Sequence, residues 1–273
     1  MTLTEMRQIL SAGDIQLTKS LGQNFLHDGN QLRRIVAAGD VQEGDQILEI
    51  GPGLGPLTEL LLGAGANVLA IEKDQRLVSV LQNRLGNNSR CRIIHDDALD
   101  HVRQHREWDD WKLVANLPYS VASPILVELA SSVKRPARMT VTLQLEVANR
   151  IVAREDEDDY GVLSLLLQLS YEAGGLFKIP AGCFFPAPDV DSACITLIQR
   201  PEPLLPEDQT KAFARLVKLA FSQRRKMMLK LLKQDWPAET LSAAFGQIGL
   251  SPQIRAEAVS LSQFVRLTQI LTP

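Results

Sequence analysis

The sequence predicts an α/β fold in which a mostly parallel, twisted sheet is followed by a small, all-helical C-terminal domain. Two observations indicate this arrangement. Short runs rich in Val, Ile and Leu alternate with helix-like stretches over roughly the first two thirds of the chain, a rhythm typical of βαβ units. After a Pro-rich break, the apolar residues recur at helical spacing.

The individual elements follow from these runs. We expect helices at Pro56–Leu62, Arg76–Leu85, Pro124–Ser131 and Glu146–Ala153. The apolar run Leu163–Ser170 fits either a strand or a helix, and a strand is favoured. The strands are expected at Gln46–Ile50, Asn67–Ile71, Arg92–His95, Lys112–Ala115, Met139–Gln144 and Ala193–Ile198.

The domain boundary is expected at the Pro-rich segment Arg200–Pro206. Residues 1–199 would form the sheet domain, residues 200–207 a linker and residues 208–273 a small helical domain. A chain of 273 residues with 45% hydrophobic residues has enough material for one large core and a smaller second one.

Cysteine usage and hydropathy bound the class of protein. The three cysteines, Cys91, Cys183 and Cys194, lack metal-binding or paired spacing, so neither a disulfide framework nor a metal site is expected. No signal-like segment or apolar run of about 20 residues is present. We therefore expect a cytoplasmic protein without a membrane partner, and the absence of an extended apolar seam favours a monomer.

The positive charges are unevenly placed although the formal net charge is −3. No acidic residue interrupts the basic side chains of the C-terminal part until Asp235. Such a cluster is either a solvated helix face or a contact for nucleic acid. It comprises Lys211, Arg215, Lys218, Arg224, Arg225, Lys226, Lys230 and Lys233.

A glycine-rich turn follows the first strand, in the run Glu49–Thr58. Gly51, Gly53 and Gly55 allow a sharp turn and a close approach of a ligand to the start of a helix. The spacing is GxGxG, with Pro56 next, whereas a dinucleotide site needs GxGxxG. The turn therefore favours a ligand without a pyrophosphate.

Acidic residues end the next two strands. Glu72 lies 21 residues after Gly51 and has the place of a ribose hydroxyl acceptor. Asp97 is a candidate acceptor for an adenine amino group; Asp96 is a rival, because adjacent strand residues point to opposite faces. An Asp at a strand end is also a common helix N-cap.

Together these residues describe a site for a nucleoside-bearing cofactor. Gly51, Glu72, Asp97 and Asn116 end four successive strands, and in an open α/β sheet such ends line one crevice. The order of glycine turn, ribose acceptor and adenine acceptor favours S-adenosyl-L-methionine over a nicotinamide. The fold predicted is thus a Rossmann-like S-adenosylmethionine methyltransferase sheet.

The segment Asn116–Tyr119, Asn-Leu-Pro-Tyr, is the candidate catalytic loop. An adenine N6 is a poor nucleophile because its lone pair is delocalised, so it needs hydrogen-bond acceptors for its protons. The Asn116 amide oxygen and the Leu117 carbonyl, held extended by Pro118, are suited to this role. Tyr119 offers an aromatic wall. The alternative is an ordinary N-cap and proline turn.

These motifs, with others in the same order, resemble the ribosomal RNA small-subunit adenine dimethyltransferase family of the KsgA type. The resemblance covers nearly the whole chain. The further motifs that carry it are Lys19–Leu26, Asp97-Ala98, Gln144–Arg150, Phe184–Ser192 and Leu219–Lys226.

The resemblance implies roles for residues at the matching positions. Gln23, Asn24 and Leu26 would cover the cofactor, and Gly51, Gly53, Glu72, Asp97, Ala98 and Asn116 would contact it. Phe184 would stack on the target base beside Asn116 and Tyr119, although Phe185 is an alternative. Arg150, Arg224, Arg225 and Lys226 would contact RNA.

The chain departs from the family pattern at two places. The acidic run Glu155–Asp159 replaces a Gly/Ser and basic loop, and we expect it to face solvent or a basic ribosomal protein. The run Met227–Lys230, Met-Met-Leu-Lys, follows Lys226 at a place where the family pattern has a Thr and an Asn. These departures concern contacts of the helical domain rather than the reaction.

The activity implied is N6,N6-dimethylation of two adjacent adenosines in a hairpin near the 3′ end of small-subunit (16S) ribosomal RNA, with a role in subunit biogenesis. The small ribosomal subunit is the implied partner. Three alternatives remain: a large-subunit RNA adenine methyltransferase conferring antibiotic resistance, a DNA or protein methyltransferase, and a ribosome-assembly binding factor with incidental catalysis. Leu117 disfavours the second, whose usual loop is Asn/Asp-Pro-Pro-Tyr.

Overall fold

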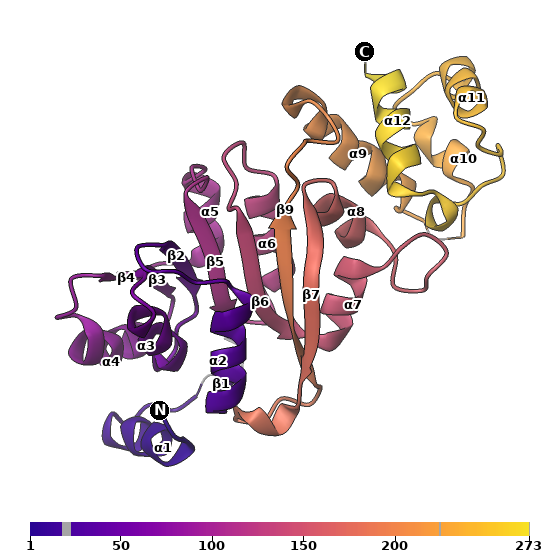
Figure 1. Cartoon of the computed structure of the whole chain (residues 1–273). Helices are drawn as coiled ribbons and strands as arrows, with labels where there is room; N and C mark the ends of the chain where they lie inside the picture. Colours follow the sequence, from indigo (N-terminus) through magenta and orange to yellow (C-terminus); the bar gives the residue numbers. More distant parts are fainter. Residues whose placement is uncertain (18–22, 224, 273) are drawn as a thin grey trace. The chain divides into compact units, whose positions relative to one another are not determined.

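The computed structural model describes residues 1–17, 23–223 and 225–272. Figure 1 shows an α/β part and a helical part, and the chain divides into two compact units. The first unit comprises Met1–Ala148 and Glu172–Gln199, and the second comprises Asn149–Tyr171 and Arg200–Pro273. The helical unit therefore includes residues 149–171 in addition to the segment that follows the Pro-rich linker.

The first unit is built on a seven-stranded sheet in the order β4-β3-β2-β5-β6-β9-β7. Strands β2 to β6 run parallel to one another, and β9 runs antiparallel to β6. The strands are β2 (Gln46–Ile50), β3 (Asn67–Glu72), β4 (Cys91–His95), β5 (Trp111–Asn116), β6 (Arg138–Gln144), β7 (Tyr171–Ile179) and β9 (Ser192–Gln199).

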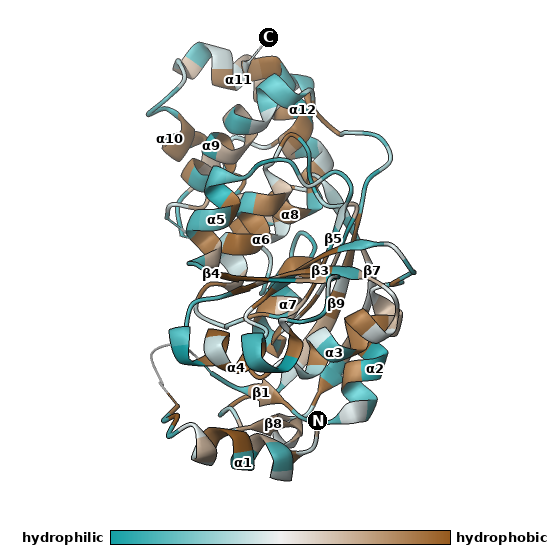
Figure 2. Ribbon diagram, turned by 90° about the vertical axis from the view of Figure 1, so that its left-hand side faces the viewer, coloured by the Kyte–Doolittle hydropathy of each residue, from teal (hydrophilic) through white to brown (hydrophobic). Residues whose placement is uncertain are grey.

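Helices cover both faces of this sheet. Figure 2 shows α5 and α6 on one face, and α2, α3 and α4 on the other. A short antiparallel ribbon joins β1 (Phe25–Leu26) to β8 (Phe184–Phe185). The helices are α1 (Leu3–Ala12), α2 (Gly29–Ala38), α3 (Pro56–Gly63), α4 (Gln75–Leu85), α5 (Ala98–Gln104) and α6 (Ala122–Ala130).

Side-chain caps fix where several of these helices begin. Asp28 accepts hydrogen bonds from the backbone of Asn30 and Gln31 at the start of α2. Asp74 and Asp97 cap α4 and α5 in the same way. Each cap satisfies backbone N–H groups that lack a partner in the first turn. Because the latter two follow β3 and β4, they place acidic side chains at the carboxyl ends of these strands.

The second unit has its own apolar core. Buried residues of several helices form one cluster, which includes Phe213, Leu216, Phe245 and Phe264. Helix α7 (Leu145–Val152) crosses into this unit from the first. The other helices are α8 (Val162–Gln168), α9 (Thr210–Ala220), α10 (Met228–Leu232), α11 (Ala238–Gln247) and α12 (Leu261–Leu271).

The sequence-based strand prediction for Leu163–Ser170 is wrong, because Val162–Gln168 form helix α8. The run contains five leucines, which favour helix, and a continuous apolar run has no period that separates helix from strand. Leu165 and Leu169 pack into the core of the helical unit. Ser164 fixes the helix start, since its hydroxyl accepts from the backbone of Gly161 and donates to the Arg150 carbonyl.

Candidate cofactor and catalytic site

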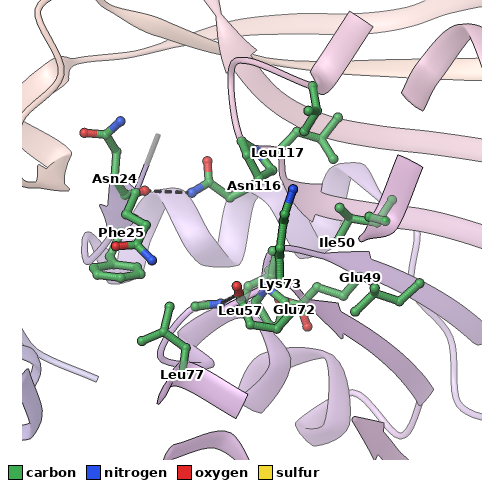
Figure 3. Close-up of a pocket in the computed structure, with 18 of the residues that line it drawn as sticks. Asn24, Phe25, Glu49, Ile50, Leu57, Glu72, Lys73, Leu77, Asn116 and Leu117 are labelled. Carbon is green, nitrogen blue, oxygen red and sulfur yellow. Dashed lines mark hydrogen bonds between the residues drawn. The ribbon is translucent and has the colours of Figure 1, made fainter. Parts of the chain in front are cut away.

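A pocket opens at the carboxyl ends of β2, β3, β4 and β5, as the strand-end pattern predicts (Figure 3). Every residue that lines it belongs to the first unit. Its predicted members are Gln23, Asn24, Leu26, Gly51, Gly53, Glu72, Asp97, Ala98, Asn116, Leu117, Pro118 and Tyr119.

The glycine turn brings three segments together at the pocket floor. Gly51 and Gly53 adopt φ of 67° and 61°, in the left-handed region. A Cβ at Gly51 would lie 3.1 Å from the Pro118 ring, and one at Gly53 would lie 2.6 Å from the Phe25 ring. Glycine therefore lets the Asn116–Tyr119 loop and the N-terminal strand β1 approach the turn closely.

Glu72 is oriented by the backbone around it. Its Oε2 accepts from Gly53 N at 3.1 Å and its Oε1 accepts from Asp74 N at 2.9 Å. Burial raises the pKa of Glu72, while these backbone N–H groups oppose the shift. Each carboxylate oxygen retains acceptor capacity, so the arrangement suits the two hydroxyls of a ribose.

Asp97 follows the end of strand β4, and its carboxylate already accepts hydrogen bonds from the protein. Its Oδ1 accepts from Leu99 N at 2.9 Å, and its Oδ2 accepts from Lys73 Nζ at 2.7 Å. The Lys73 ammonium holds the pKa of Asp97 below its usual value. The side chain is thus an ionised acceptor at the pocket wall as well as a helix cap.

Asp96, the alternative acceptor, also lines the pocket. Its Oδ1 accepts from Asp97 N at 2.8 Å, and its Oδ2 lies 2.9 Å from His101 Nδ1. The structure therefore places both candidates beside the same subsite. The choice of Asp97 as adenine acceptor stays a prediction.

The amide of Asn116 has a defined orientation. Its Nδ2 donates to the Asn24 carbonyl at 3.0 Å, shown as the dashed line in Figure 3. Its Oδ1 is buried and has no hydrogen-bond partner among the residues that the structure describes. A buried acceptor without a partner is costly, so it indicates a ligand donor at this position.

The rest of the catalytic loop is held by the neighbouring strands. Leu117 is buried, and its N–H donates to the Thr142 carbonyl at 3.0 Å. The Tyr119 hydroxyl lies 2.6 Å from Ser192 Oγ, which ties the loop to the last residue of the Phe184–Ser192 motif. Burial raises the pKa of the Tyr119 phenol, so it stays neutral.

The residues present fit S-adenosyl-L-methionine. The glycine turn leaves room for a ligand against backbone, and Glu72 and Asp97 offer acceptors at two strand ends. Asn116 also lines the pocket, and its buried Oδ1 has no partner among the described residues. Apolar side chains, including Leu26, Leu57 and Leu77, complete the lining.

Comparison with known proteins settles the family. A family model described as "Ribosomal RNA adenine dimethylase" matches residues 15–273. The chain belongs to this family.

Curated relatives match over nearly the whole chain. A protein of Clostridium perfringens named "Ribosomal RNA small subunit methyltransferase A" is 38% identical over 268 residues, covering 97% of this chain and 94% of the relative. A protein of the same name from Geobacillus thermodenitrificans is 37% identical over 279 residues, with 98% and 95% covered.

Solved structures share the fold. The crystal structure of the 23S rRNA methyltransferase ErmE matches with a TM-score of 0.69 at 26% identity, covering 91% of this chain and 100% of the other. A dimethyladenosine transferase from Plasmodium falciparum matches with a TM-score of 0.74 at 21% identity, covering 89% and 95%. The Rossmann-like methyltransferase fold with C-terminal helices is therefore confirmed.

The base-stacking residue implied by the family is not brought into the pocket. Phe184 is 3% exposed and packs into the core with Leu26 and Ile179. Phe185 is partly buried beside Phe25, with the Arg7 guanidinium 5.1 Å above its ring. Either ring would have to move to stack on a base, so this assignment stays a prediction.

The basic residues proposed for RNA lie in the helical unit. Arg150, Arg225 and Lys226 are exposed there. Arg224 lies outside the described residues, as do Lys19 to Gly22 of the N-terminal motif. The exposed positions are compatible with phosphate contacts and do not test them.

The sequence missed several pocket residues. Glu49 and Lys73 line the pocket, and Phe25 packs against the turn at Gly53. Glu49 opens the glycine motif, yet nothing in the sequence shows that burial raises its pKa to about 8. An Asp directly before a predicted helix is typical of an N-cap, so the sequence could have predicted that Asp74 begins the helix after β3.

Proposed function

We propose that this chain transfers methyl groups from S-adenosyl-L-methionine to the N6 atoms of two adjacent adenosines, in a hairpin near the 3′ end of small-subunit (16S) ribosomal RNA. The observation that carries the reaction is the buried, unpartnered Oδ1 of Asn116 at the pocket. Full-length relatives named small subunit methyltransferases support the substrate.

The cofactor, when bound, supplies a methyl carbon made electrophilic by its sulfonium. The chain's own residues hold the reactants. The glycine turn and Glu72 would fix the nucleoside, and Asp97 or Asp96 would receive the adenine amine of the cofactor. Gln23, Asn24, Leu26 and Ala98 would complete the cofactor site.

Asn116 would orient the target amine. Because Nδ2 donates to the Asn24 carbonyl, the amide cannot rotate without losing a hydrogen bond, and Oδ1 stays available to accept from the target amine. Accepting a hydrogen bond from one N6–H would orient the amine so that its lone pair points at the position of the cofactor's methyl group. The amide is not a base at neutral pH, so its contribution is electrostatic preorganisation.

The Leu117 carbonyl would accept a hydrogen bond from the second N6–H, and the ring of Tyr119 would border the base. Phe184 would stack on it, and Arg150, Arg224, Arg225 and Lys226 would hold RNA phosphates. Since small ribosomal subunits are the substrate, the enzyme would act in the cytoplasm, as a monomer. The structure contains no helix long and apolar enough to cross a membrane within its described residues.

Subunit selectivity is the experiment that tests the substrate. Purified protein would be incubated with radiolabelled cofactor and, separately, unmethylated small subunits and large subunits. Label in small-subunit RNA alone is expected. Label in large-subunit RNA instead would assign the chain a 23S rRNA methyltransferase activity, and binding of small subunits without any label would favour an assembly factor.

A further inference from the structure

Asp74 lies at the centre of a hydrogen-bond network beside the cofactor pocket. It follows Glu72 by two residues, and its backbone N–H donates to Glu72 Oε1 at 2.9 Å. Its side chain is buried and caps α4, with Oδ1 accepting from Arg76 N at 3.0 Å. The same residue therefore orients the ribose acceptor and starts the next helix.

The Arg76 guanidinium binds this carboxylate through a fork, a pair of hydrogen bonds to its two oxygens. Its Nε donates to Asp74 Oδ1 at 2.9 Å, and its Nη2 donates to Oδ2 at 2.6 Å. Its Nη1 donates to the Gln16 carbonyl at 3.0 Å, so the guanidinium also holds the N-terminal part of the chain. The fork lowers the pKa of Asp74 to about 2, which keeps the carboxylate ionised.

The N-terminal segment returns to the same carboxylate. Gln23 Nε2 donates to Asp74 Oδ2 at 2.9 Å, and the next residue, Asn24, accepts the hydrogen bond from Asn116 Nδ2. Both residues line the pocket. Gln23 is thus attached to Asp74, beside the predicted ribose acceptor Glu72, and Asn24 is attached to the amide of Asn116.

We propose that Asp74 and Arg76 are positioning residues, which hold Gln23 and Asn24 over the cofactor and so fix the amide of Asn116. This inference rests on the proposed function of the pocket. Neither residue touches the reacting atoms. They act through Gln23 on the cofactor and through the Asn24 carbonyl on the target-base acceptor, which couples cofactor binding to the orientation of Asn116.

The test compares Arg76→Ala with Arg103→Ala. The matched control removes an arginine of similar exposure, 51% against 43%, whose ion pairs with Asp100 and Glu128 involve no predicted site residue. Titration calorimetry with S-adenosylhomocysteine measures cofactor affinity without catalysis. We expect Arg76→Ala to raise its Kd about tenfold, and Arg103→Ala to leave it within about twofold; tenfold equals about 1.4 kcal/mol, as expected for a hydrogen bond to a charged group.

Two further readouts separate positioning from folding. Hydrogen exchange at the amides of residues 23–26, measured without cofactor, should accelerate in Arg76→Ala and not in the control. Adding millimolar ethylguanidinium should restore part of the affinity of Arg76→Ala. Arg76→Lys should be intermediate, since one ammonium cannot reproduce the fork on Asp74 and the Gln16 contact together.

The outcomes are distinct. Unchanged exchange at residues 23–26 and unchanged Kd in Arg76→Ala, with a lower unfolding temperature, would make the network purely structural and overturn the proposal. Asp74→Asn should show the same exchange and affinity changes as Arg76→Ala. If the wild-type chain bound no S-adenosylhomocysteine, the proposed function would fail. The exchange measurement would still show whether Asp74 and Arg76 hold residues 23–26 in place.

Discussion

Replacing Asn116 with Ala removes a buried acceptor at the pocket that has no partner among the described residues and whose orientation is fixed by the hydrogen bond from Nδ2 to the Asn24 carbonyl. Deleting a single preorganised partner of this kind lowers kcat by about 100- to 1000-fold, or about 2.7–4 kcal/mol of transition-state stabilisation. The change also removes the hydrogen bond to the Asn24 carbonyl, which contributes about 0.5–1.5 kcal/mol to stability. We therefore expect a folded protein with a large loss of methyl transfer.

Single-turnover transfer to unmethylated small subunits measures this loss apart from product release. Asn116→Asp should be as inactive, because its carboxylate faces the Asn24 carbonyl and loses the donor. Thr142→Val is the control: it removes a buried hydroxyl from the neighbouring strand, outside the pocket lining, and should keep near-normal rates. A rate for Asn116→Ala within about tenfold of the wild type would refute the electrostatic role.

Other changes have defined consequences. Gly53→Ala should weaken cofactor binding in calorimetry, because its Cβ would lie 2.6 Å from the Phe25 ring and φ is 61°; unchanged affinity would mean that Phe25 moves freely. Burial raises the pKa of Glu49 from 4.5 to about 8, so the folded state holds the proton more tightly than the unfolded one. Its stabilising contribution is present below pH 4.5 and is lost as pH rises to about 8. The free energy of unfolding, measured with denaturant, should therefore fall less steeply with pH in Glu49→Gln than in the wild type, by up to about 1.4 kcal/mol per pH unit. Equal slopes in the two proteins would show that Glu49 is already ionised.

The sheet and its ligand-binding edge were predictable because the parallel strands are short apolar runs, most of them buried, and because polar residues lie at or just after the carboxyl ends of β3, β4 and β5. The bounds of β2 were predicted correctly, and the strands before Glu72, Asp97 and Asn116 were predicted to within one residue at either end. Since the carboxyl ends of parallel strands share one edge, their order along the chain was enough to bring these side chains together.

Elements outside this pattern were missed or wrongly assigned. Strand β7 carries Gly174 and Gly175 and exposes most of its residues, so it lacks the apolar run of a buried strand. Helix α8 lies in the core of the helical unit, and its uniform run of leucines concealed its period. Local sequence could not supply either assignment.

Long-range contacts explain what remained hidden in the site. The Gln23–Asp74 hydrogen bond joins residues 51 positions apart, and the Asn24–Asn116 bond joins residues 92 apart. The burial of Phe184 arises from pairing of β8 with β1, at the other end of the first unit's sequence. Such contacts depend on how the chain folds back on itself, which no local pattern encodes.

Nucleoside analysis of small-subunit RNA after methyl transfer is the most direct test of the central claim. Unmethylated small subunits would be incubated with the protein and radiolabelled S-adenosyl-L-methionine, and the RNA digested to nucleosides and separated. We predict label in N6,N6-dimethyladenosine, mapping to adjacent positions in a hairpin near the 3′ end. Label confined to another nucleoside, or to large-subunit RNA, would contradict the account.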